Sequence, residues 1–152
     1  MNRKQGGFTL IELVVTVIVL AIIATIAAPS FGTMLNRQNL NKSTAELVGT
    51  LAKARAKAAL ERREITVSIG TSGADTVNTL HWAPEGNAVL DSTPQNIVFM
   101  PNGLVKDPTS NTVIGASTSF TICDHISDAT ASKTISISRM GTIEIPVDGD
   151  CT

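Results

Sequence analysis

The chain is poor in the groups on which most enzymes and nucleic-acid-binding proteins depend. Its 152 residues include two histidines and 3% aromatic residues, and its formal net charge is −1. His81 and His125 lie in no spacing that suggests a Ser/His/Asp nucleophile system. We therefore expect neither an enzymatic activity nor a cofactor.

Cysteine is also scarce, because Cys123 and Cys151 are the only two. Such a pair would be incidental in a cytosolic protein, but in an exported protein it predicts one disulfide. A disulfide-bonded cysteine cannot ligate a metal as thiolate. We therefore expect no metal site at Cys123 and its neighbours Asp124, His125 and Asp128.

Charge is unevenly distributed along the chain. Residues 37–64 carry seven basic and three acidic side chains, whereas residues 65–152 carry three basic and nine acidic ones. The acidic second part offers little to a phosphate backbone. The basic face of residues 37–64 consists of Lys53, Arg55, Lys57, Arg62 and Arg63. No aromatic residues lie between them, which favours a solvated or subunit-contacting face over a DNA-binding one.

One long apolar run is present, from Phe8 to Ala28. As a helix its 21 residues would be about 31 Å long, which matches the apolar core of a bilayer. Arg3 and Lys4 precede it, and basic residues on that flank keep the N-terminus in the cytoplasm. The chain after Pro29 is then expected outside the cytoplasm.

Three interpretations of this run compete. "TIAAPS" could provide the cleavage site of a secretory signal peptide, but the apolar region of such a signal is shorter and rarely carries an acidic residue near its start. A plain signal anchor leaves Glu12 unexplained. In the third interpretation, a basic leader ends at Gly7, and the mature chain begins at Phe8 with Glu12 as its fifth residue.

The stretch "GGFTLIELVVTVIVLAIIATIAAPSF" resembles the class III signal of type IV pilins and type II secretion pseudopilins. The resemblance implies cleavage after Gly7 by the prepilin peptidase and N-methylation of Phe8. Pro29 stands where members of the family have a helix-kinking proline. A carboxylate in the bilayer costs several kcal/mol, so we expect Glu12 to pair with the N-terminal amine of a neighbouring subunit in a filament of parallel helices.

The rest of the sequence predicts an α+β fold in which a long N-terminal helix packs on a mainly antiparallel sheet or sandwich. An apolar stripe at spacings of three and four continues the helix through residues 37–64: Leu40, Thr44, Leu47, Leu51, Ala54 and Ala58. Alternating apolar residues and turn signals predict strands at 65–69, 79–83, 96–100, 119–123, 133–138 and 141–145. The expected parts are a leader at 1–7, a transmembrane and assembly helix at 8–28, an amphipathic helix at 29–64 and a periplasmic β domain at 65–152.

The β part resembles the GspH/FimT/FimU group of minor pilins and pseudopilins. The resemblance is carried by Phe99, Pro101, Gly103, Cys123 and the last hairpin around Gly141. DNA-binding FimT members have a Gly-Arg-x-Arg motif in this hairpin, where this chain has Gly-Thr-Ile-Glu at 141–144. Arg139 is the one cation left there for DNA, and nucleic acid is therefore not an expected partner.

The resemblance implies a structural role in the inner membrane, with the C-terminal domain in the periplasm, and later in a pilus at the cell surface. The expected function is that of a minor pilin near the filament tip, which primes pilus assembly and serves twitching motility. The expected partners are other minor pilins, the major pilin, the prepilin peptidase, the assembly platform and membrane lipid. A GspH-type pseudopilin of a type II secretion system and a FimT-like DNA-binding pilin remain alternatives.

Overall fold

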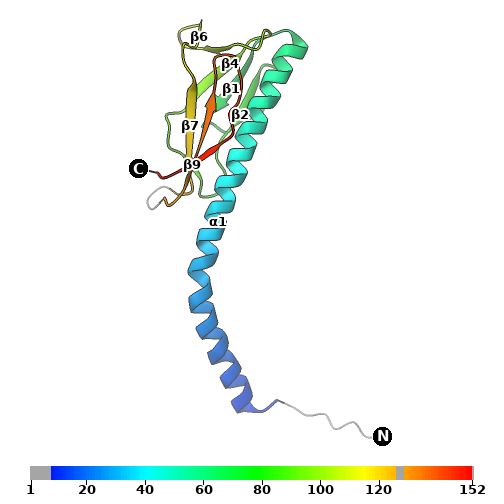
Figure 1. Ribbon diagram of the computed structural model, residues 1–152. Helices are drawn as coiled ribbons and strands as arrows, with labels where there is room; N and C mark the ends of the chain where they lie inside the picture. The colour runs from blue at the N-terminus through cyan, green and yellow to red at the C-terminus, as the bar shows by residue number, and fades with distance from the viewer. Residues whose placement is uncertain (1–7, 126–128, 152) are drawn as a thin grey trace, which may run out of the picture. The chain divides into compact units, whose positions relative to one another are not determined.

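The computed structural model describes residues 8–125 and 129–151, without the side chain of Pro29. The chain divides into two compact units, Met1–Leu35 and Asn36–Thr152. One helix, α1 (Leu10–Glu61), runs through both (Figure 1). Arg62 follows it with a φ of 53°, a left-handed conformation typical of a helix C-terminus. The helix therefore ends three residues earlier than the sequence predicts.

The part of α1 in the first unit is an apolar helix without a covering layer. Its large aliphatic side chains from Leu10 to Ile26 are exposed within the described residues. It is long and apolar enough to cross a membrane by length and composition, with a mean hydropathy of 2.8. Such a surface needs lipid or other helices around it.

The part of α1 in the second unit buries the predicted stripe. Leu47, Leu51, Ala54 and Ala58 are fully buried, and so are the remaining two positions, Leu40 and Thr44. The Thr44 hydroxyl donates a hydrogen bond to the Leu40 carbonyl at 2.7 Å, so its burial leaves no unsatisfied donor. The small alanines allow the strands to approach the helix closely.

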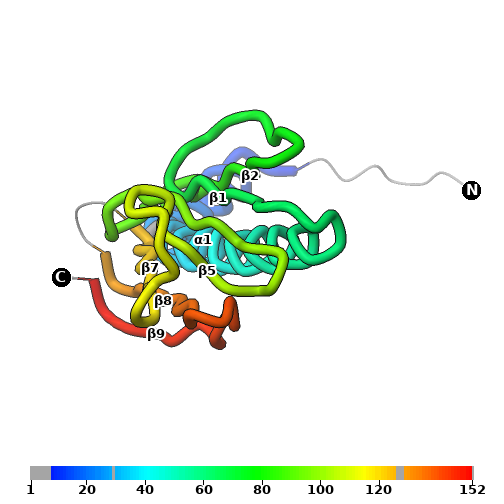
Figure 2. The backbone as a smooth tube through the Cα atoms, turned by 90° about the horizontal axis from the view of Figure 1, so that it is seen from above, coloured from blue at the N-terminus to red at the C-terminus, as the bar shows by residue number. Residues whose placement is uncertain are grey.

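Nine strands in the described residues form two sheets that pack on this half of α1 (Figures 1 and 2). The five-stranded sheet has the order β2-β1-β4-β5-β6, with β1 (Ile65–Ile69), β2 (Thr79–Trp82), β4 (Gln95–Phe99), β5 (Val105–Asp107) and β6 (Thr112–Val113). The four-stranded sheet has the order β3-β7-β8-β9, with β3 (Val89–Leu90), β7 (Thr118–Cys123), β8 (Ser132–Ile137) and β9 (Val147–Gly149). Phe99 and Phe120, one from each sheet, are the largest fully buried side chains of the common core.

The α+β fold is confirmed, and five of the six predicted strands are found to within one residue at each end. One pairing differs from the antiparallel expectation, because β1 and β2 are parallel, with Thr66 opposite Thr79. The reason is the length of residues 70–78, which carry the chain back to the starting end of β1 before β2 begins. A tight hairpin turn would have reversed it instead.

The predicted strand at 141–145 is wrong. Ile143 forms a single bridge with Ile137, and the last strand is β9, in which Val147 lies opposite Thr134. Between these two pairs, two residues of β8 lie opposite three residues of the returning chain, so the register shifts by one. The shift coincides with Pro146, which has no N–H to donate to the ladder.

Candidate functional site

The start of α1 is capped by Thr9. The Glu12 backbone N–H donates to the Thr9 hydroxyl at 3.3 Å, and the Leu13 N–H donates to the Thr9 carbonyl at 3.2 Å. The sequence Thr9-x-x-Glu12 is that of a capping box, in which the acidic side chain can also turn back to the N–H of the capping residue. Thr9 was not singled out from the sequence, although this motif could have identified it.

Glu12 differs from the other polar residues of the apolar segment. The hydroxyls of Thr16 and Thr25 donate to the carbonyls of Leu13 and Ile22, each at 2.8 Å. These threonines are therefore satisfied inside the helix, as lipid requires. The Glu12 carboxylate has no hydrogen-bond or ion-pair partner among the residues that the structure describes.

The surroundings of Glu12 are apolar. Ile11 and Leu13 flank it in the chain, and both are exposed, as are Phe8 and Leu10. An unpaired carboxylate on such a surface is costly in lipid. Gly7, the predicted cleavage position, lies outside the described residues. Pro29 lies inside α1, and its role as a kink stays a prediction.

Cys123 and Cys151 form a disulfide, with their Cα atoms 6.1 Å apart. This distance is within the usual range for such bonds. The bond joins the end of β7 to the chain beyond β9, so it pins the C-terminal segment to the sheet. Lys133 supports the same segment by an ion pair with Asp148 at 2.5 Å.

Asp124 anchors the connection between β7 and β8. Its carboxylate accepts hydrogen bonds from the Thr130 N–H and hydroxyl, both at 2.9 Å, and from the Ala131 N–H at 3.3 Å. Burial raises the pKa of Asp124, but these hydrogen bonds outweigh burial and hold the pKa below its ordinary value. The acidic group is thus a structural anchor beside the disulfide.

Three residues of the family resemblance, Phe99, Gly103 and Gly141, lie together at the turn before Ile143. The Gly141 N–H donates to the Ser138 carbonyl at 2.8 Å, and Gly141 has a φ of 69°. A Cβ on Gly141 would lie 2.6 Å from the Gly103 carbonyl oxygen and 3.3 Å from the Phe99 ring. Only glycine fits both the backbone conformation and this close approach.

The basic face of α1 is largely occupied by contacts within the domain. Lys53 pairs with Asp75 at 3.6 Å, and Arg63 pairs with Glu61. Arg55 donates to the carbonyl of Met140 at 3.1 Å, a structural role that the sequence did not reveal. The predicted candidate for DNA, Arg139, adjoins this contact in the chain.

Among residues 8–125 and 129–151, no three His, Cys, Asp or Glu side chains are arranged to hold a metal ion. Asp128, considered above as a neighbour of Cys123, lies outside these ranges.

Comparison with known proteins decides the family. The model of the type II transport protein GspH family matches residues 43–141, and that of the prokaryotic N-terminal methylation motif matches residues 2–28. The chain belongs to the GspH family. Members of this family are pilins and pseudopilins, which are structural proteins, so a role of this kind is established for the chain.

A solved structure shows the same fold. The type IV minor pilin FimU of Pseudomonas aeruginosa (strain PAO1) is 22% identical, with a TM-score of 0.50 over 72% of this chain and 89% of the FimU chain. No curated protein sequence gives a significant match. At this identity the likeness to FimU supports the pilin fold and no finer assignment.

Proposed function

We propose that the chain is a minor pilin of a type IV pilus, incorporated with other minor pilins near the filament tip to prime assembly. The observation that carries the proposal is Glu12, the one polar side chain of the apolar run Phe8–Ala28 without a partner among the described residues. The N-terminal amine of a neighbouring subunit supplies the missing cation. The pair sets the axial register between subunits and makes assembly more favourable than dispersal in lipid.

Processing precedes assembly in this proposal. The prepilin peptidase removes residues 1–7, and the new amino terminus at Phe8 is methylated. The capped start of α1 places Phe8 and Glu12 about one helical turn apart. Before assembly, the chain spans the inner membrane with its domain in the periplasm, in contact with lipid and the assembly platform. Afterwards it contacts other minor pilins and the major pilin at the cell surface.

The second candidate is a GspH-type minor pseudopilin of a type II secretion system. The family model that matches most of the domain favours it. The covalent attachment of the C-terminal segment favours the pilus, because an exposed filament benefits more from such a bond than a periplasmic one.

The two candidates differ in where the chain is found. Pili sheared from cells and washed should contain the chain without residues 1–7 and with one added methyl group, as shown by intact-mass analysis. Deletion should abolish piliation and leave protein secretion unchanged. Absence from sheared pili together with a secretion defect would establish the pseudopilin instead.

A further inference from the structure

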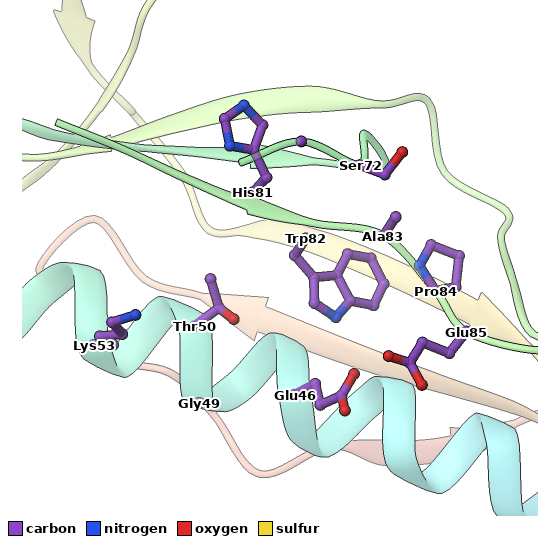
Figure 3. A pocket seen from close by; sticks show the side chains of 11 residues that line it. Glu46, Gly49, Thr50, Lys53, Ser72, His81, Trp82, Ala83, Pro84 and Glu85 are labelled. Carbon is purple, nitrogen blue, oxygen red and sulfur yellow. The ribbon is translucent and has the colours of Figure 1, made fainter. Parts of the chain in front are cut away.

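A groove of about 570 Å³ lies between α1 and the end of β2 (Figure 3). Its helix side is formed by Glu46, Gly49, Thr50 and Lys53, and the strand side runs from His81 to Glu85. The helix side is open at Gly49, because a Cβ placed there has nothing within 4 Å. The volume is in the range of sites that hold small molecules or short peptide segments, about 300–1,000 Å³.

Trp82, the one tryptophan of the chain, forms the inner wall of the groove. Its side chain is directed toward α1, with the indole nitrogen on the helix side (Figure 3). The residue is 4% exposed, and its Nε1–H has no acceptor among the residues that the structure describes. The Nε1 atom exposes less than 1 Å² of surface, so it lies beneath the wall of the groove and an occupant does not reach it.

The rim carries opposite charges at its two ends. Glu46 and Glu85 lie at one end and Lys53 at the other (Figure 3). Glu46 and Lys53 are seven positions apart on α1, about 10 Å along the axis, which about three residues of extended chain can span.

The acidic end of the groove carries more negative than positive charge. Lys42 is shared between two carboxylates, those of Glu85 and Glu46, and its distance to Glu46 is 3.8 Å. Lys53 is already paired with Asp75. The carboxylates around the groove therefore outnumber the lysines, and a basic group is the preferred occupant of the end formed by Glu46 and Glu85.

We propose that this groove receives an extended loop of a neighbouring pilin subunit, with a basic side chain at Glu46 and Glu85. The inference rests on the proposed incorporation into a filament. An extended segment is narrower than a helix, which is about 10 Å wide with its side chains, and therefore fits along the groove more readily. Assembly through α1 brings the exposed side of the same helix close to neighbouring subunits.

Site-specific photo-crosslinking in piliated cells tests the contact. A benzophenone amino acid in place of Lys53, at the exposed rim, should give an adduct with another pilin of the filament. Mass spectrometry should place the bond in a non-helical segment that contains Lys or Arg. The same probe in place of Ala59, which is exposed outside the groove, should give little of this adduct, because it does not face the occupant of the groove. Glu12→Ala should abolish the adduct.

The outcomes separate this inference from the proposed function. A Lys53-substituted chain that is found in sheared pili but gives no pilin adduct overturns the groove contact and leaves the pilin role intact. An adduct with lipid or with an unrelated protein overturns it as well. Wild-type chain that is absent from sheared pili overturns the filament role and the groove contact together.

A blocking variant provides an independent test. Gly49→Leu fills the groove from an open position, and leucine favours helix over glycine, so the chain should fold at least as well as the wild type. It should enter pili about tenfold less, whereas the matched control Ala59→Leu should enter them normally. Equal incorporation of both variants would contradict the proposal.

Discussion

Removal of the Cys123–Cys151 disulfide should destabilise the domain by a predictable amount. The two cysteines are 28 positions apart, and closing a loop of that length in the unfolded chain corresponds to about 3–4 kcal/mol at 25 °C in the chain-entropy treatment. The loop contains β8, β9 and the turn at Gly141. For a unit of this size, such a loss lowers the Tm by roughly 10 °C.

The assay is thermal unfolding of the full chain in detergent, followed by circular dichroism in the oxidised and reduced forms. Cys123 is 3% exposed, so a double substitution to alanine also removes buried atoms. The reduced wild-type chain is therefore the cleaner comparison, and the double alanine variant should unfold slightly below it. A Tm that changes by less than about 2 °C on reduction would refute the claim that the bond holds the C-terminal segment.

Three further predictions concern the domain. Because the pKa of Asp124 is lowered in the folded chain, its contribution to stability is present above the unfolded pKa of about 3.9 and is lost as the pH falls through the folded pKa. Asp124→Asn should therefore lower the Tm at pH 7 and make the Tm less dependent on pH below about 4. An unchanged pH profile would contradict this. Gly141→Ala should lower the free energy of chemical unfolding by about 2–4 kcal/mol, because of the left-handed backbone and the contact with Gly103. In the control Gly115→Ala the new Cβ meets nothing within 4 Å, so its free energy of unfolding should lie within about 0.5 kcal/mol of the wild type. In a mobility-shift titration the chain should bind duplex DNA with a non-specific Kd of about 10⁻⁴–10⁻⁶ M that depends strongly on salt. Submicromolar, salt-resistant binding that Arg139→Glu abolishes would restore the DNA-receptor alternative.

The sequence predicted those elements in which a regular pattern and a buried face coincide. All six positions of the helix stripe from Leu40 to Ala58 are buried, because a spacing of three and four places them on one side of α1. β1 matches its predicted bounds for the analogous reason, since Ile65, Val67 and Ile69 all point into the core. The disulfide was predictable because the chain has only one pair of cysteines.

Other features depend on contacts between distant residues that leave no local pattern. The parallel pairing of β1 and β2 depends on the path of residues 70–78, which have no hydrophobic periodicity. The alternation at 141–145 predicts a strand, but Pro146 cannot continue its ladder and the pairing resumes one residue out of register. The bond from Arg55 to the Met140 carbonyl, across 85 positions, likewise required the fold to be known.

The candidate assembly site shows the same division. The apolar run and its single carboxylate identified Glu12 directly, since a charge in such a segment is a functional hypothesis by default. The sequence could not show that the threonine hydroxyls of this helix are satisfied internally and that the carboxylate is not. This contrast is the basis for the proposed pairing of Glu12 with a cation outside the described residues.

The central claim, that a charge pair at Glu12 drives assembly, is tested most directly by the incorporation of Glu12→Gln into sheared pili. Glutamine keeps the size and hydrogen bonding of the side chain and removes only its charge. Glu144→Gln, an exposed carboxylate of the domain, is the matched control. The account predicts that Glu12→Gln is processed and reaches the membrane, and that Glu144→Gln enters pili normally. Glu12→Gln should be depleted from pili at least about tenfold, which corresponds to ~1.4 kcal/mol. Incorporation of Glu12→Gln at the level of the control would contradict it.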